Sequence, residues 1–274
     1  MAKLYLVGTP IGNLGDFSPR AIETLRSVDF IAAEDTRVTL KLLNRFEIEK
    51  PMVSYYQHNM RERGEIVLSR ILAGEDCALV TDAGMPAISD PGEQLVALCA
   101  EAGVEVVAVP GPTAAATALA LSALPSGRFT FEGFLSVSKS ERRTHLDSLK
   151  NERRTMIFYE APHKLTNTLK DLAAAFGGER RISLCRELTK IHEEVIRTTI
   201  AEAMQRFEEN APRGEFVLVV EGAPEQQKEE ATPEQAAELA RRLMADGMSA
   251  SSAAKEAASV TGIKKSDIYR LLQQ

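Results

Sequence analysis

Short apolar blocks and longer mixed blocks alternate along the first 125 residues. The short blocks are almost continuously apolar, as in strands that are buried on both faces of a sheet. Strand and helix following one another in this regular order predict a parallel sheet with helices on both faces. The predicted strands are residues 3–7, 30–33, 52–54, 78–81 and 104–109, and the predicted helices are residues 19–28, 38–46, 61–73, 92–102 and 113–121.

The pattern changes near residue 125. Two helical blocks separate the first apolar runs of this second part, and only a short gap separates later ones, so the sequence predicts a mixed sheet. Ser138 and Glu141 have the spacing of a capping box and predict a helix that begins there and runs to about residue 150. The predicted strands are residues 129–134, 155–159, 182–186, 194–199 and 216–220.

The chain becomes polar and acidic over residues 222–231, as a linker would, and helical signals then return. Thr232, Pro233 and Gln235 are typical of a capped helix start. Three short helices are predicted, around residues 233–246, 249–259 and 264–272. We therefore expect an α/β fold with a parallel N-terminal domain (1–124), a mixed C-terminal domain (125–223) and a small helical appendage (232–274).

Two interpretations of the appendage stay open. Ala258, Gly262 and Ile268 fall where a helix-turn-helix needs a small residue, a turn glycine and a core aliphatic residue. A plain helical cap on the second domain explains the same pattern equally well.

Composition limits the classes of function. The chain has 274 residues, of which 44% are hydrophobic and 26% charged, which is enough to bury two cores and remain soluble. No apolar run approaches the roughly 20 residues that span a bilayer, and the amino terminus lacks the pattern of a secretion signal. We therefore expect a cytoplasmic protein.

The net charge of −6 means that any basic surface for nucleic acid must be local. Residues 138–154 carry six basic and three acidic side chains. This segment is either a solvated helix face or a contact for an RNA backbone. Lys264, Lys265 and Arg270 near the end of the chain could add to such a contact.

The cysteines do not indicate a metal site. Cys77, Cys99 and Cys185 are isolated, with none of the Cys or His spacings that build a zinc site. Their apolar flanks predict buried, reduced thiols, and we expect no metal.

Three glycine- and proline-rich loops follow predicted strands of the first domain, and the one after residue 81 is the most distinctive. It holds two acids, two glycines and two prolines within residues 81–92 and is longer than most loops between a strand and a helix. Residues 8–14 and 110–114 form the other two loops, and residues 8–14 match no phosphate-binding glycine motif. Because parallel strands end at one edge of a sheet, the loops predict a ligand site there.

These loops, with residues 33–37, 158–160, 186–190 and 214–215, resemble the ribosomal RNA small subunit methyltransferase I family of the tetrapyrrole methylase superfamily. The resemblance covers essentially the whole chain in the right order. It implies a two-domain homodimer that uses S-adenosylmethionine to methylate the ribose 2′-hydroxyl of a cytidine in the decoding region of 16S ribosomal RNA.

The resemblance also implies a donor pocket in the cleft between the domains. Transfer to a ribose hydroxyl further needs alignment of the reacting atoms and a group within hydrogen-bond reach that accepts or partly removes the hydroxyl proton. For this chemistry we single out Asp35, Arg37, His58 and Lys190. The donor-binding residues implied by the family are Pro10, Asp82, Gly84, Pro86, Ile88, Ser89, Thr113, Ala114, Tyr159 and Leu188.

Structural interpretations compete with some of these roles. Asp35 and Arg37 also fit an acidic, solvated helix start. His58 is equally well explained as a loop residue packed against nearby tyrosines, and Lys190 as a member of an ion pair.

Two other functions remain to be separated from RNA methylation. The same fold and donor could serve a tetrapyrrole or another small molecule, but neither the terminal helices nor the basic segment is needed for that. A non-catalytic RNA-binding or assembly protein would be expected to have lost the donor loops, whereas Pro10, Asp82 and Pro110 are all present.

Overall fold

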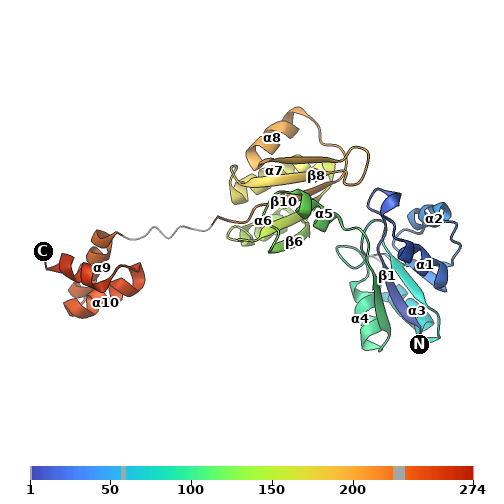
Figure 1. Ribbon diagram of the computed structural model, residues 1–274, viewed down its shortest axis with the longest axis horizontal. Coiled ribbons are helices and arrows are strands. Elements are labelled where there is room, and N and C mark those ends of the chain that lie inside the picture. The colour runs from blue at the N-terminus through green and yellow to red at the C-terminus, as the bar shows by residue number, and fades with distance from the viewer. Residues whose placement is uncertain (1, 57–59, 225–231, 274) are drawn as a thin grey trace. The chain divides into compact units, whose positions relative to one another are not determined.

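A computed structural model describes residues 2–56, 60–224 and 232–273 (Figure 1). Its contacts divide the chain into two units, Met1–Ala223 and Pro224–Gln274. The first unit contains two five-stranded sheets, one parallel and one mixed. The predicted α/β class is thus confirmed, whereas a domain boundary at residue 124 stays a prediction because the contacts group residues 1–223 together.

The first sheet has the strand order β3-β2-β4-β1-β5 and is parallel throughout. Its predicted strands and helices are confirmed with small shifts at their ends. The strands are β1 (Lys3–Val7), β2 (Phe30–Ala33), β3 (Met52–Ser54), β4 (Cys77–Val80) and β5 (Glu105–Val109), and the helices are α1 (Pro19–Ser27), α2 (Thr36–Arg45), α3 (Met60–Leu72), α4 (Glu93–Glu101) and α5 (Ala114–Leu121), with a 3₁₀ turn η1 (Leu14–Asp16).

Successive residues of its central strands are buried on opposite faces. In β2, Ile31 packs with residues of α1 and α2, whereas Phe30 packs with residues of α3 and α4. This period of two explains why the strand sequences are apolar at every position. All three cysteines are buried, two of them in the core under α3 and α4, as predicted.

The strand order creates a switch point between β1 and β4. The chain leaves β1 towards α1 on one face, and it leaves the neighbouring strand β4 towards α4 on the other face. Ligands of open α/β sheets bind in the crevice at such a point, beyond the carboxyl ends of the strands. The loops after β1 and β4 both lie there.

The second sheet is mixed, with the strand order β6-β7-β10-β8-β9. Strands β6 and β7 are parallel, and the other neighbours are antiparallel. The predicted mixed sheet is therefore confirmed. Its elements are β6 (Phe129–Phe134), α6 (Lys139–Ser148), β7 (Thr155–Glu160), α7 (Pro162–Phe176), β8 (Arg181–Arg186), β9 (Glu194–Thr199), α8 (Ile200–Glu209) and β10 (Phe216–Val220).

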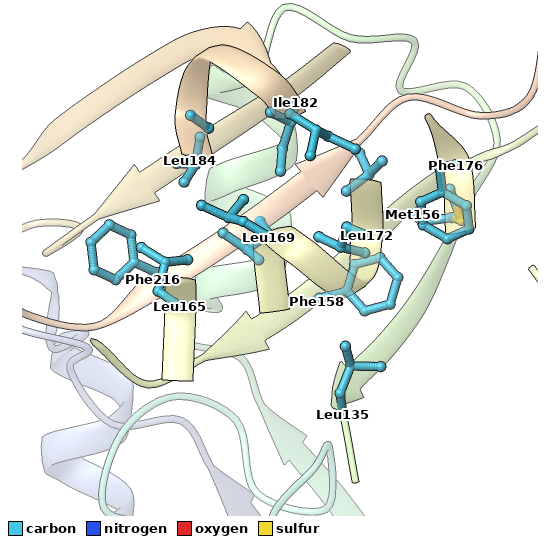
Figure 2. Packing of buried hydrophobic residues seen from close by; sticks show 14 of the residues in the cluster. Leu135, Met156, Phe158, Leu165, Leu169, Leu172, Phe176, Ile182, Leu184 and Phe216 are labelled. Atoms are coloured by element: carbon cyan, nitrogen blue, oxygen red, sulfur yellow. The ribbon is translucent and has the colours of Figure 1, made fainter. Parts of the chain in front are cut away.

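Helix α7 covers one face of this sheet through residues at helical spacing. Figure 2 shows Leu165, Leu169 and Leu172 of α7 against Phe158 and Ile182 of the sheet. Burying side chains of this size contributes roughly 1.5–3 kcal/mol each, so this layer is a main source of stability for the second sheet.

Helix α5 covers the opposite face. Although α5 directly follows the last strand of the first sheet, its Ala118 and Leu119 pack with Ile157, Cys185 and Val217 of the second sheet. The amino end of α5 is therefore held where residues of both sheets meet.

The predicted capping box of α6 is wrong. Ser138 is the N-cap residue, but its side chain makes no capping hydrogen bond. Glu141 instead accepts a hydrogen bond of 2.7 Å from the Ser136 hydroxyl. The Glu141 carboxylate, which a capping box would pair with the Ser138 amide, therefore bonds a residue outside the motif.

The second unit is helical, with α9 (Pro233–Ala245), α10 (Ala250–Thr261) and α11 (Lys265–Leu272). The predicted start of α9 is confirmed, because Thr232 and Gln235 form a reciprocal capping box. Gly262 ends α10 in the left-handed region, with φ of 75°, and Ile268 is buried among alanines of α9 and α10. These three helices share a hydrophobic core of their own.

Candidate functional site

The three loops at the edge of the first sheet are joined directly. Thr9 and Gly84 exchange backbone hydrogen bonds of 2.9 and 3.1 Å, and the Gly8 amide donates to the Val109 carbonyl at 3.1 Å. Gly8 also faces Gly111 so closely that a Cβ on Gly8 would lie 2.7 Å from the Gly111 Cα. The loops after β1, β4 and β5 therefore form one continuous surface at the switch point.

The loop after β4 has an unusual backbone. The non-glycine residues Ala87 and Ser89 have φ of 66° and 65°, and Gly84 and Gly92 also have positive φ. Left-handed backbone at a non-glycine residue costs of order 1–3 kcal/mol and persists where the surroundings impose it, often at binding sites. Ile88, between Ala87 and Ser89, is 51% exposed. The loop thus presents an apolar side chain on a constrained backbone.

Acidic residues that directly follow β2 support this loop. The Glu34 carboxylate accepts hydrogen bonds from the Thr81 hydroxyl at 2.5 Å and from the Asp82 amide at 3.3 Å. The Asp35 amide in turn donates to Asp82 Oδ1 at 3.2 Å. Burial is the main cause, and the negative charge of Glu34 the second, of a raised pKa at both Asp82 and Asp90. The pKa of Asp90 is raised to about 6. This edge of the sheet therefore concentrates negative charge.

Asp90 is expected to make stability depend on pH. Its pKa is higher in the folded chain than the ordinary 3.8, so its contribution is present at low pH and is lost as pH rises from about 4 to about 6. Asp90→Asn should flatten this decline and be more stable than the unaltered protein at pH 7 by about 1 kcal/mol, after allowing for solvent screening. Urea unfolding at several pH values measures the effect.

Asp16→Asn, which changes an exposed carboxylate of η1, is the matched control. If Asp90→Asn keeps the full pH dependence of the unaltered protein, the carboxyl of Asp90 is not its source.

Asp35 and Arg37 form a compact pair at the start of α2. Asp35 is the N-cap and accepts a hydrogen bond of 2.8 Å from the Arg37 amide, while the Arg37 guanidinium grips the same carboxylate at 3.0 and 2.6 Å. The hydrogen bonds from Arg37 lower the pKa of Asp35 to about 2. Asp35 is thus a weak proton acceptor, and the Arg37 side chain, 86% exposed, points a cation towards solvent.

The second sheet contributes an ion cluster at the end of β8. Lys190 Nζ lies 2.9 Å from both Glu187 Oε1 and Glu215 Oε2. Partial burial by itself would lower the pKa of Lys190, but the hydrogen bonds to Glu215 and Glu187 outweigh it and raise that pKa. The ammonium therefore stays protonated at neutral pH and can donate hydrogen bonds but not accept a proton.

Lys190 also touches the loop after β1. A Cβ on Gly12 would lie 2.6 Å from Lys190 Cγ and 3.0 Å from the Leu188 carbonyl oxygen. Beside it, Thr189 Oγ1 is buried without a hydrogen-bond partner among the described residues, and Thr189 has φ of 65°. An unpaired buried hydroxyl costs free energy unless a ligand or solvent satisfies it.

Tyr159 joins the second sheet to α5. Its hydroxyl accepts a hydrogen bond of 3.2 Å from the Ala115 amide. This amide lies in the first turn of α5, where amides have no acceptor within the helix. Burial raises the pKa of Tyr159, so its hydroxyl stays neutral at physiological pH. Thr113 caps the same helix end through the Ala116 amide. Tyr159, Thr113 and Ala114 thus meet at one helix terminus.

The structure brings most of the predicted residues into two groups. One group, on the first sheet, holds Pro10, Asp35, Arg37, Gly84 and the loop after β4, and the other holds Thr113, Ala114, Tyr159, Leu188 and Lys190. The contact between Gly12 and Lys190 connects them. His58 lies outside the described residues.

The predicted site residues did not include the supporting acids Glu34 and Asp90. Glu34 stands beside the selected Asp35, and Asp90 lies within the selected loop, but only the packing of β2 against β4 shows that they share one cluster. Both acids lie in segments that the sequence pattern or the family resemblance had singled out, but their supporting role follows only from the fold.

The basic segment is largely occupied by internal ion pairs. Arg142 bonds Asp171 at 2.7 Å, Lys150 bonds Asp147 at 2.8 Å, and Arg154 bonds Glu152 at 2.6 Å. These pairs favour the interpretation as a solvated helix face over that of an RNA contact.

The residues that the structure describes contain neither a candidate metal centre nor a candidate membrane span. No group of three or more His, Cys, Asp or Glu side chains there could hold a metal ion. No helix in the described ranges has the length and apolarity needed to cross a membrane.

Family models match nearly the whole chain. Residues 3–204 match the model of tetrapyrrole (corrin/porphyrin) methylases. Residues 230–274 match the model of the RsmI C-terminal HTH domain, which favours the helix-turn-helix interpretation of the last three helices.

Curated relatives agree with these matches. Ribosomal RNA small subunit methyltransferase I of Synechocystis sp. is 49% identical over 99% of this chain and 97% of the relative. The protein of the same name from Thermotoga maritima is 47% identical to this chain. The match covers 81% of this chain and 99% of that relative. The first unit, 223 of 274 residues, is also 81% of the chain.

A solved structure shows the same fold at low sequence identity. Uroporphyrin-III-C-methyltransferase from Thermus thermophilus matches with a TM-score of 0.57 and 19% identity, over 80% of this chain and 94% of that one. Together with the joined loops of the first sheet, these matches show that the chain belongs to the tetrapyrrole methylases and, within them, to the ribosomal RNA small subunit methyltransferase I family.

Proposed function

We propose that this chain transfers the methyl group of S-adenosylmethionine to the ribose 2′-hydroxyl of a cytidine in the decoding region of 16S ribosomal RNA. The observation that carries the proposal is the 49% identity, over 99% of the chain, to a ribosomal RNA small subunit methyltransferase I. We further propose that it acts in the cytoplasm as a homodimer on RNA or on the small ribosomal subunit.

The residues at the sheet edge suit this donor. S-adenosylmethionine supplies a methyl group on a positively charged sulfur, ready for transfer to a nucleophile. The acids Glu34, Asp82 and Asp90 form a negative region that favours a cationic ligand, and the unpaired Thr189 hydroxyl could bond a polar one. The residues proposed to hold it are Pro10, Asp82, Gly84, Pro86, Ile88, Ser89, Thr113, Ala114, Tyr159 and Leu188.

Charged residues beside the donor site are proposed to position the RNA substrate. Lys190, held protonated between two glutamates, is proposed to donate a hydrogen bond to the ribose oxygen. This bond orients the oxygen for in-line attack and stabilises the negative charge that develops on it as the hydroxyl proton passes to solvent. The oxygen–methyl bond then forms as the sulfur–methyl bond breaks. Arg37, fixed by Asp35 and exposed, is proposed to contact an RNA phosphate. Because its pKa is about 2, Asp35 is a poor proton acceptor, and we propose that its role is to fix the position of Arg37.

The competing functions have less support. The tetrapyrrole enzyme with this fold is 19% identical to the chain, which is evidence for the fold alone. A non-catalytic role would leave the strained loop after β4 and the charge cluster around Glu34 without a purpose.

The direct experiment incubates the protein with labelled S-adenosylmethionine and small ribosomal subunits from a strain that lacks the enzyme. We expect label in 16S RNA and none in a tetrapyrrole acceptor offered in parallel. A label that enters the tetrapyrrole, or no transfer to subunits that a competent control enzyme methylates, would contradict the proposal.

A further inference from the structure

Strand β6 contains a bulge that changes the direction of its last side chains. In its pairing with β7, Phe131 lies opposite Ile157 and Gly133 lies opposite Phe158, so Glu132 is an extra residue. Gly133 takes φ of 63°, and the Glu132 carboxylate is fixed by His145 Nε2 of α6 at 2.8 Å. A bulge of this kind redirects the side chains that follow it and often lies beside an active site.

The bulge places two phenylalanines on one face. In a regular strand, residues three apart point to opposite faces of the sheet. Here the rings of Phe131 and Phe134 both lie against Tyr159, with centroids at 5.1 and 5.5 Å and interplanar angles of 72° and 64°. The extra residue is therefore what brings Phe134 to the side of Tyr159.

Phe134 is the exposed end of this aromatic cluster. Phe131 and Tyr159 are partly buried, whereas Phe134 is 61% exposed. A single exposed apolar side chain is common on a protein surface, so exposure alone indicates nothing. The bulge and the contact with Tyr159 distinguish Phe134, because they hold a largely exposed ring in a defined position against a second ring.

The cluster adjoins the proposed donor site on two sides. The Tyr159 hydroxyl is bonded to the Ala115 amide at the start of α5. On the other side, a Cβ on Gly133 would lie 3.3 Å from Ser89 Oγ, in the strained loop after β4. Phe134 thus stands where the loop of the first sheet and the aromatic face of the second sheet meet.

We propose that Phe134 stacks on the base of the nucleotide that is methylated. This inference rests on the proposed function. Proteins that recognise unpaired RNA bases stack them on aromatic side chains, and a base must leave its helical stack before its ribose can enter a cleft. With the base on Phe134, the attached ribose would lie between the aromatic cluster and the donor loops.

The test compares Phe134→Ala with Phe134→Tyr, Phe134→Leu and the control Phe129→Ala, which removes another exposed ring from the same strand. We expect Phe134→Ala to lower kcat/KM for small ribosomal subunits about 10-fold, mainly through KM, since stacking contributes that much per base. Calorimetric affinity for S-adenosylmethionine should not change. Phe134→Tyr should keep the kcat/KM of the unaltered protein, whereas Phe134→Leu should show the same decrease as Phe134→Ala.

Several results would overturn the stacking role. These are full kcat/KM in Phe134→Ala, rescue by leucine, an equal loss in Phe129→Ala, or a change in oligomeric state by light scattering, which would place Phe134 in a contact between copies of the chain. If the unaltered protein does not methylate subunits at all, the proposed function fails and the assignment fails with it. Activity of the unaltered protein separates these two cases.

Discussion

Lys190→Ala is expected to lower kcat by about 100-fold or more while leaving the affinity for S-adenosylmethionine nearly unchanged. Removing one preorganised donor that stabilises developing charge costs roughly 10²–10³ in kcat in other enzymes. Lys190 is such a donor in our account, held at 2.9 Å from both Glu187 and Glu215. Single-turnover methylation of small subunits and calorimetry of donor binding together measure the two quantities.

Two further variants make the result specific. Lys190→Arg keeps the charge but not the compact ammonium geometry, so we expect intermediate activity. Lys170→Ala removes a surface lysine from an exposed ion pair with Glu208 and should behave like the unaltered protein. Full turnover in Lys190→Ala would remove Lys190 from the chemistry and leave it as a member of a structural ion cluster.

Gly8→Ala should weaken binding of S-adenosylmethionine at least about 10-fold and destabilise the first unit by roughly 1–3 kcal/mol. The new Cβ would lie 2.7 Å from backbone atoms of Gly111, which cannot move aside as a side chain could. The loops after β1 and β5 would have to separate, and the surface that they share would be disrupted. Calorimetry measures the affinity, and urea unfolding measures the stability.

Gly127→Ala is the matched control, because a Cβ there meets no atom within 4 Å. Unchanged donor affinity in Gly8→Ala would show that the close approach of these loops does not shape the donor pocket.

The hydrophobic pattern was sufficient to predict both sheets. Strands β6, β9 and β10 begin and end at the predicted residues, and the apolar run of β10 is bounded by Glu215 and Glu221. The start of α2 was predicted two residues late. Asp35 caps the helix through the Arg37 amide, so the helix includes polar residues that the apolar pattern could not assign.

The predicted site residues were found through the loops and the family resemblance, whereas their electrostatic states required the fold. The pKa of Asp90 depends on burial and on Glu34, which directly follows another strand, β2. The protonated state of Lys190 depends on Glu215, 25 residues away in the chain. Pairing across strands sets both, and neither can be inferred from local sequence.

The aromatic cluster shows a second limit of sequence reasoning. Residues 129–134 were correctly predicted as a strand, but a strict alternation would place Phe131 and Phe134 on opposite faces. The bulge at Glu132 reverses this, and it is visible only in the register against β7.

The position of the transferred methyl group on the RNA distinguishes a ribose methyltransferase from a base methyltransferase. Small subunits methylated with labelled donor are hydrolysed in alkali, which cannot cleave the RNA chain after a ribose whose 2′-oxygen is methylated. We expect the label to be recovered in a single alkali-resistant dinucleotide that begins with cytidine. Label recovered in ordinary mononucleotides, and therefore on a base, would contradict it.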